Sequence, residues 1–197
     1  MTVRVATVED VGVDVFRVPT EQPETDGTLQ WDHTTVVAVT ASSGGVAGLG
    51  FTYGPPACAT VAAELADVVR DRSALDTTGS WQAMIRSVRN DGRPGVVSMA
   101  VSAVDVALWD LKARLLGLPL VTLLGAVRPA VDVYGSGGFT SYDDATLAEQ
   151  LSGWAQSGIP RVKMKVGRDV DADERRVRAG RAAGRDPRAL FAGPQRA

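Results

Sequence analysis

The stretch "RVKMKVG", residues 161–167, places two lysines on either side of a methionine in a segment that otherwise has the composition of a buried strand. On a strand, successive side chains point to opposite faces, so the apolar residues would face one side and Lys163 and Lys165 the other. The chain contains three lysines and 18 arginines, so lysine is the exception among its basic residues. A lysine can lose its proton when its pKa is depressed, whereas an arginine does not. We therefore interpret the pair as a chemical requirement.

The segments around this pair alternate between strand and helix patterns. The sequence predicts strands over 131–138 and 160–167 and helices over 143–158 and 171–184, which is typical of parallel βαβ units with both sheet faces covered. Two amines about 7 Å apart on a covered face repel each other, which lowers the pKa of at least one. Lys165 is nearer the carboxyl end of the strand, and we predict that it is a general base at the mouth of a barrel.

A solvated edge strand is the alternative interpretation of two lysines at this spacing. The scarcity of lysine, the βαβ context and the different domain that precedes it favour the catalytic interpretation.

The first part of the chain has the pattern of a small antiparallel sheet. Alternating apolar residues predict strands over 3–18, 34–41 and 45–54. The sequence "SSGG" at 42–45 predicts a tight hairpin between the last two. Residues 19–33 contain two prolines, a glycine and several acids, and we expect a long mobile loop there.

Three helices are predicted after the sheet, over 59–71, 79–90 and 96–116. Alanines spaced along the third helix indicate close packing against a neighbour, and Gly117 with Pro119 ends that helix. We place a domain boundary at 127/128.

Composition excludes several classes of function. The net charge of −2 and the pI near 5.4 give no reason to expect nucleic acid or an anionic membrane as a partner. Cys58 is the single cysteine, so an intrachain disulfide or a cysteine-based metal cluster is excluded. No long apolar run or signal peptide is present, and we expect a cytoplasmic protein.

Four stretches together resemble the enolase superfamily, in its mandelate racemase-like branch. They are "ETDGTLQWDHTT" (24–35), the helix 100–125, "VYGSGG" (133–138) and "VKMKVGRD" (162–169). The resemblance covers about residues 1–183. It implies an α+β capping domain, residues 1–127, made of an antiparallel sheet and helices. It further implies that residues 128–197 are the first two βα units and the start of the third strand of a truncated (β/α) TIM-type barrel.

The resemblance also implies a chemistry, in which a base removes the proton α to a carboxylate and Mg²⁺ stabilises the enediolate. Lys165 would be the base and Lys163 its electrostatic partner. The substrate would be a small carboxylate, either a hydroxy acid or an acid sugar, and the reaction racemisation, dehydration or cycloisomerisation. The capping loops would choose the substrate through Thr25, Asp26, Trp31, Tyr53 and Gly54.

The chain departs from the resemblance after its second βα unit. In the family an aspartate that binds Mg²⁺ follows the third strand, whereas this sequence has "ALFAGPQRA", with Gly193 near the position of the ligand. We therefore expect no metal ligands and no bound Mg²⁺ in this chain, although Mg²⁺ is expected for the intact family member.

The arginine-rich end of the chain suggests two interpretations. Arginine, alanine, glycine and proline are the residues that GC-rich DNA encodes in a wrong frame. We therefore hypothesise a frameshift near Gly184 followed by an early stop, and an inactive chain. A basic face for nucleic acid is the competing interpretation, but it lacks interleaved aromatic residues.

A second function class stays open. A capping domain with an unfinished barrel would expose apolar strand edges and could serve as a non-catalytic interaction or oligomerisation module. In both cases we expect a homo-oligomer.

Overall fold

The computed structural model describes residues 6–183 and 190–194. It divides into two compact units, the first formed by the chain up to Val18 and by Thr34–Val127, the second by Pro19–His33 and the chain from Arg128 onward. The hypothesised frameshift point, Gly184, lies outside the described residues.

Three strands form the antiparallel sheet in the order β1-β2-β3. They are β1 (Asp10–Thr25), β2 (Gln30–Ser43) and β3 (Val46–Tyr53), and the ends of β1 and β2 extend into the second unit. The hairpin between β2 and β3 turns at Gly44 and Gly45, whose φ values of 57° and 78° suit the two-residue turn that matches strand twist. The predicted hairpin is confirmed.

The prediction of a long mobile loop over residues 19–33 is wrong. Strand β1 continues to Thr25, β2 begins at Gln30, and a short turn joins them. The two prolines in this stretch, Pro19 and Pro23, misled the prediction. They are compatible with a strand because β1 is an edge strand, the position to which prolines within a sheet are largely confined.

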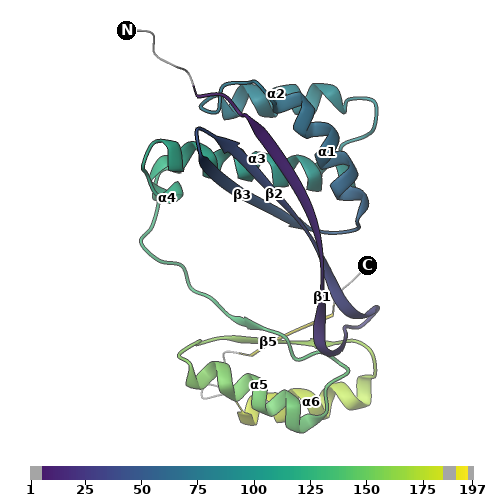
Figure 1. The fold of residues 1–197 in the computed structure, drawn as a ribbon. Helices are drawn as coiled ribbons and strands as arrows, with labels where there is room; N and C mark the ends of the chain where they lie inside the picture. Colours follow the sequence, from purple (N-terminus) through teal and green to yellow (C-terminus); the bar gives the residue numbers. More distant parts are fainter. Residues whose placement is uncertain (1–5, 184–189, 195–197) are drawn as a thin grey trace. The chain divides into compact units, whose positions relative to one another are not determined.

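Helices α1 (Ala57–Val69), α2 (Thr77–Ser87) and α3 (Val96–Leu115) confirm the three predicted helices to within three residues at each end. Helix α3 packs against β3, and α1 and α2 pack against α3 (Figure 1). A short helix, α4 (Leu120–Leu124), follows and was not predicted.

Two glycines of β3 bring the backbones of strand and helix into direct contact. A Cβ atom at Gly48 would lie 2.2 Å from the amide nitrogen of Leu111, and one at Gly50 would lie 2.1 Å from the carbonyl oxygen of Ala103. Ala103 and Ala107 face this contact from α3 and are fully buried. The predicted close packing by the alanines of this helix is therefore confirmed, and β3 supplies its other half.

The second unit contains a parallel sheet of order β4-β5-β6. Its elements are β4 (Gly135–Ser136), α5 (Asp144–Gln156), β5 (Val162–Val166), α6 (Val170–Ala183) and β6 (Leu190–Pro194). The predicted alternation is confirmed, although the first strand is much shorter than predicted.

The apolar core of this unit is small. Four buried residues, Leu147, Leu151, Val162 and Met164, form its centre between the helices and the sheet. Helix α5 begins at the N-cap Asp143, whose carboxylate accepts a hydrogen bond from the amide of Thr146 at 2.7 Å. An N-cap of this kind satisfies one of the free N–H groups at the helix start.

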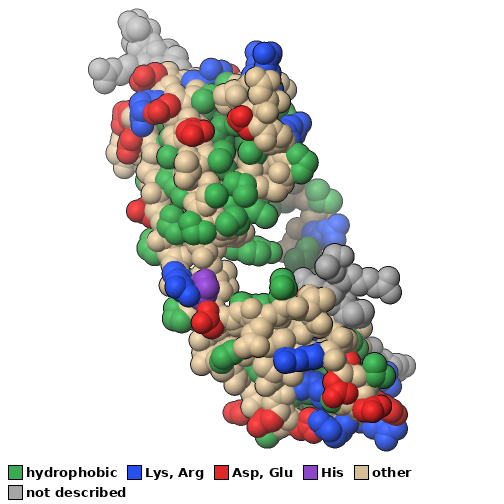
Figure 2. Space-filling model, turned by 90° about the vertical axis from the view of Figure 1, so that its right-hand side faces the viewer, with side chains coloured by type: hydrophobic (Ala, Val, Ile, Leu, Met, Phe, Trp, Pro, Cys, Tyr) green, Lys and Arg blue, Asp and Glu red, His purple; other side chains and the backbone are tan. Residues whose placement is uncertain are grey.

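Hydrophobic side chains also lie at the surface (Figure 2). On β3, Leu49, Phe51 and Tyr53 are more than half exposed, on the sheet face opposite α3.

Among the described residues, no helix is long and apolar enough to cross a membrane. The cytoplasmic location stays a prediction.

Candidate functional site

The two lysines of β5 lie on the sheet face that the sequence predicted. Val162 and Met164 are buried against the helices, whereas Lys163 and Lys165 alternate with them and are partly exposed. Lys165 is in register with Gly193 of β6. Because glycine has no side chain, the neighbouring strand contributes only backbone atoms at this position. On this face of the sheet an open hollow lies beside Lys163 and Gly193.

The environment of Lys165 favours its neutral form. Burial lowers the pKa of this amine, and the positive charge of Lys163 lowers it further, while the negative charge of Asp26 acts in the opposite direction. An amine whose pKa is lowered in this way is suited to accept a proton. The roles of Lys165 as general base and of Lys163 as its electrostatic partner stay predictions.

Lys163 lies beside an aromatic pair. Its Nζ atom is 5.9 Å from the centre of the Tyr134 ring, and that ring is 6.1 Å from the ring of Phe191 on β6. These three side chains line an open, mostly apolar hollow of about 500 Å³. A ligand bound near Lys163 would meet a positive charge at one side and aromatic surface at the other.

Residues 23–29, which we call the capping segment, carry the second charged group of the site. Asp26 is buried, with 3% of its surface exposed. Its Oδ1 atom accepts hydrogen bonds from the amides of Leu29 at 2.8 Å and Thr28 at 2.7 Å. These bonds lower the pKa of Asp26, so it is ionised at neutral pH.

The capping segment contacts the parallel sheet directly. A Cβ atom at Gly27 would lie 3.1 Å from the carbonyl oxygen of Val166, at the carboxyl end of β5. Trp31 donates from its indole nitrogen to Glu24 at 2.8 Å, and its ring packs edge-on against Phe139 at 5.5 Å. The segment therefore lies at the strand end where Lys165 is located.

The predicted substrate-binding residues divide between the two units. Thr25, Asp26 and Trp31 belong to the second unit together with the lysines. Tyr53 and Gly54 lie at the end of β3 in the first unit, where Tyr53 is 73% exposed. The substrate-binding role of all five stays a prediction.

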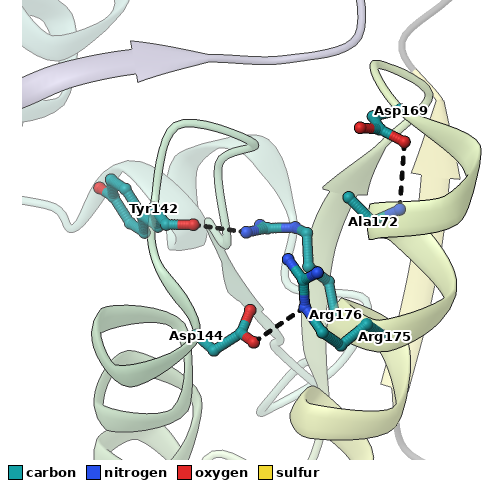
Figure 3. Close-up of polar contacts among 6 residues, drawn as sticks. All are labelled: Tyr142, Asp144, Asp169, Ala172, Arg175 and Arg176. Carbon is teal, nitrogen blue, oxygen red and sulfur yellow. Dashed lines mark hydrogen bonds and ion pairs between the residues drawn. The ribbon is translucent and has the colours of Figure 1, made fainter.

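Sequence reasoning missed Arg176, which is buried in the second unit (Figure 3). It lies in the arginine-rich stretch that we interpreted as a sign of a nearby frameshift or as a basic face. Its guanidinium instead donates to the carbonyl oxygens of Tyr142, Phe139 and Gly138. Arg176 and Gly180 are one helical turn apart on the face of α6 that turns inward, but the sequence does not distinguish Arg176 from the exposed arginines beside it.

The described residues do not fit a magnesium ion. Within residues 6–183 and 190–194, no group of three or more histidine, cysteine, aspartate or glutamate side chains could hold a metal. Strand β6 contains no acid, and Mg²⁺ requires several oxygen ligands in a near-octahedral arrangement.

Comparison with known proteins fixes the family. Residues 11–125 match the model of the mandelate racemase/muconate lactonizing enzyme N-terminal domain. The chain belongs to this family. The capping domain predicted from the sequence is thereby confirmed, and the parallel order β4-β5-β6 confirms the predicted start of a parallel sheet.

Three relatives illustrate the family. The chain is 36% identical over 180 residues to the 3,6-anhydro-alpha-L-galactonate cycloisomerase of Streptomyces coelicolor, covering 87% of this chain and 50% of the relative. A crystal structure of a mandelate racemase/muconate lactonizing enzyme-like protein from Rubrobacter xylanophilus is 53% identical, with a TM-score of 0.92 over 94% of this chain and 52% of that one. The L-talarate/galactarate dehydratase of Salmonella typhimurium, liganded with Mg and L-lyxarohydroxamate, is 28% identical, with a TM-score of 0.84 over 93% of this chain and 51% of that one. The chain spans about half the length of these relatives.

Proposed function

We propose that the intact family member represented by this chain removes the proton α to the carboxylate of a hydroxy acid or acid sugar, leading to dehydration, cycloisomerisation or racemisation. The observation that carries the proposal is the position of Lys165 on β5, where it shares with Lys163 the sheet face that carries the open hollow. Burial and the charge of Lys163 lower the pKa of Lys165 there. Relatives support it, because they include a cycloisomerase and a dehydratase of sugar acids. Mg²⁺ is proposed for the intact enzyme from such relatives alone, one of which is liganded with Mg.

Each residue of the site has a separate part in this chemistry. Lys165 accepts the α proton at its Nζ atom. Lys163 disfavours the protonated form of Lys165 and attracts the substrate carboxylate. Asp26, from the capping segment, limits how far the pKa of Lys165 falls, and so keeps the amine basic enough to hold the proton that it takes.

The three lysines of the chain make this proposal directly testable. Lysine labelled with ¹³C at Cε gives three signals, which Lys→Arg variants assign. We expect Lys165 to titrate below an ordinary lysine, and galactarate to shift the signals of Lys163 and Lys165. The signal of Lys112, in the first unit, is the internal control. An ordinary titration of Lys165 with no response to the acid sugar would rule out its role as base.

We also propose that the described chain does not turn over. A base without metal ligands has nothing to stabilise the charge that develops on the substrate. We expect no incorporation of deuterium at the α carbon when the chain is incubated with acid sugars and Mg²⁺ in heavy water. Mg²⁺-dependent exchange that is lost in Lys165→Arg would contradict this.

The alternative function, a non-catalytic interaction module, draws support from the exposed apolar residues of both units. Leu49, Phe51 and Tyr53 on β3, and Val133 and Phe191 in the second unit, are at least half exposed. Such surface favours association, including the predicted homo-oligomer. Size-exclusion chromatography with light scattering tests this, and a compact monomer would count against it.

A further inference from the structure

We propose that Arg176 is a positioning residue that holds the carboxylate of Asp26 beside Lys165, through the loop of residues 138–142. The inference rests on the proposed role of Lys165 as the base. Three successive sets of contacts within the second unit carry it.

The first set joins Arg176 to the 138–142 loop. The guanidinium donates from Nη1 to the carbonyl oxygen of Tyr142 at 2.5 Å, and from Nη2 to those of Phe139 at 2.8 Å and Gly138 at 3.2 Å. Arg176 is 4% exposed, so water does not compete for these bonds. The rigid fork of an arginine can serve several fixed acceptors at once, which a single ammonium group does less well.

The second set joins the same loop to the capping segment. The amide of Thr140 donates to the carbonyl oxygen of Thr25 at 2.7 Å, and the Thr140 hydroxyl donates to the carbonyl oxygen of Asp26 at 2.9 Å. The hydroxyl of Ser141 donates to the carbonyl oxygen of Pro23 at 2.8 Å. The loop thus fixes the backbone on both sides of the Asp26 side chain.

The third set joins the loop to the base. The amide of Lys165 donates to the carbonyl oxygen of Gly138 at 3.0 Å, which is also an acceptor for Arg176. Lys165 and the capping segment are therefore held by one loop. That loop is held by the Arg176 guanidinium, which binds three of its carbonyl oxygens, and by the Gln150 side chain, which accepts from the amide of Gly138 at 2.8 Å. The charged groups that act on Lys165 include Lys163 of β5 and Asp26 of the capping segment.

Arg175 offers a matched control. It is adjacent in sequence, but its side chain is exposed and pairs with Asp144 at 3.1 Å (Figure 3). A change at Arg175 removes a charge from α6 without removing a donor to the 138–142 loop. The charged groups that act on Arg176 itself are Asp144, Asp173 and Arg175.

The test measures how strongly Asp26 acts on Lys165 in three backgrounds. In the full chain labelled with [ε-¹³C]lysine, Asp26→Asn is expected to lower the pKa of Lys165, because it removes a negative charge. In the Arg176→Met background, the same substitution is expected to leave the titration of Lys165 unchanged. In the Arg175→Met background, the full downward shift should be retained.

Thr140→Val keeps the test decisive if Arg176→Met does not fold. It removes the hydroxyl bond to the capping segment but keeps the shape of the side chain, and it should also reduce the effect of Asp26→Asn. An undiminished effect in either variant would overturn the proposal, as would the absence of any effect in the unmodified background. Those results would leave the role of Lys165 as base standing, because that role is judged by the pKa of Lys165 alone and by its response to galactarate.

Discussion

Different kinds of interaction stabilise the interior of each of the two units. In the first unit, α3 packs against β3 at backbone contact and is covered by α1 and α2, and the buried residues form one large apolar cluster. In the second unit, four buried apolar residues are supplemented by hydrogen bonds from Arg176 to the 138–142 loop and from Thr140 of that loop to the capping segment. The first unit should therefore be most sensitive to added volume, and the second to the loss of a single apolar or polar group.

The largest effect is expected from Gly50→Val. Its Cβ would lie 2.1 Å from the carbonyl oxygen of Ala103, which belongs to a helix backbone and cannot move aside cheaply. We expect a loss of about 4 kcal/mol or more from the free energy of unfolding of the first unit. Urea unfolding followed by circular dichroism measures this. Gly12→Val is the control, because nothing lies within 4 Å of a Cβ there, and equal stability of the two variants would contradict the close contact.

Leu147→Ala should have the next largest effect, and in the other unit. Leu147 is fully buried in the small cluster of four, and removing it costs about 2–5 kcal/mol. We expect the variant's second unit to unfold at a lower urea concentration than in the wild type, while the urea midpoint of the first unit stays unchanged. Amide hydrogen exchange, which reports on each residue, distinguishes the two. Simultaneous loss of protection in both units would show that they unfold as one.

Asp26→Ala is expected to cost about 2 kcal/mol at pH 7, because the amides of Thr28 and Leu29 lose a charged acceptor in partly buried hydrogen bonds. The pKa of Asp26 is lower in the folded chain than in the unfolded one, so its contribution is fully present above the ordinary aspartate pKa of about 3.9 and is lost as pH falls through the folded value. The difference between wild type and variant should therefore shrink in acid. Urea unfolding at pH 7 and below pH 3 checks this. A stability difference between wild type and variant that grows as the pH falls would contradict a lowered pKa of Asp26 in the folded chain.

The smallest effects should come from exposed ion pairs, and they should be alike in both units. Arg114 pairs with Asp110 on α3 at 2.8 Å, and Arg178 pairs with Glu174 on α6 at 2.5 Å, each four residues apart. We expect Arg114→Gln and Arg178→Gln to change the unfolding free energy by at most about 0.5 kcal/mol, measured in the same urea series. A much larger loss in one unit would mean that surface charge contributes to the contrast between them.

The elements of the fold that were predicted correctly are those with strong local signals. Helix α3 combines regular apolar spacing with Gly117 and Pro119 at its end, and the β2–β3 hairpin contains two glycines at the turn. The part of β1 beyond Val18 was missed because its two prolines give that stretch the composition of a loop. Whether such prolines end a strand depends on its position in the sheet, which local sequence does not encode.

The candidate site was predictable where the side-chain types are unusual and unpredictable where they are common. Lys163 and Lys165 were identified because lysine is rare in this chain and because alternation on a strand assigns them a face. Arg176 was missed because it is one of 18 arginines, and its neighbours Arg175 and Arg178 are exposed. Its burial follows from the carbonyl groups of a loop more than 30 residues away in sequence.

The hydrogen bond between Thr140 and the carbonyl oxygen of Thr25 has a consequence for biosynthesis. The two residues are separated by 115 positions, and most of the first unit is encoded between them. At a synthesis rate of about 5–20 residues per second, the capping segment leaves the ribosome roughly 6–23 s before its partner loop does. During that interval the tip of the β1–β2 hairpin lacks this partner, while the helices α1 to α3 can already assemble on β3. The segment that carries Asp26 is thus among the first parts of the chain to be made and among the last to be held in place.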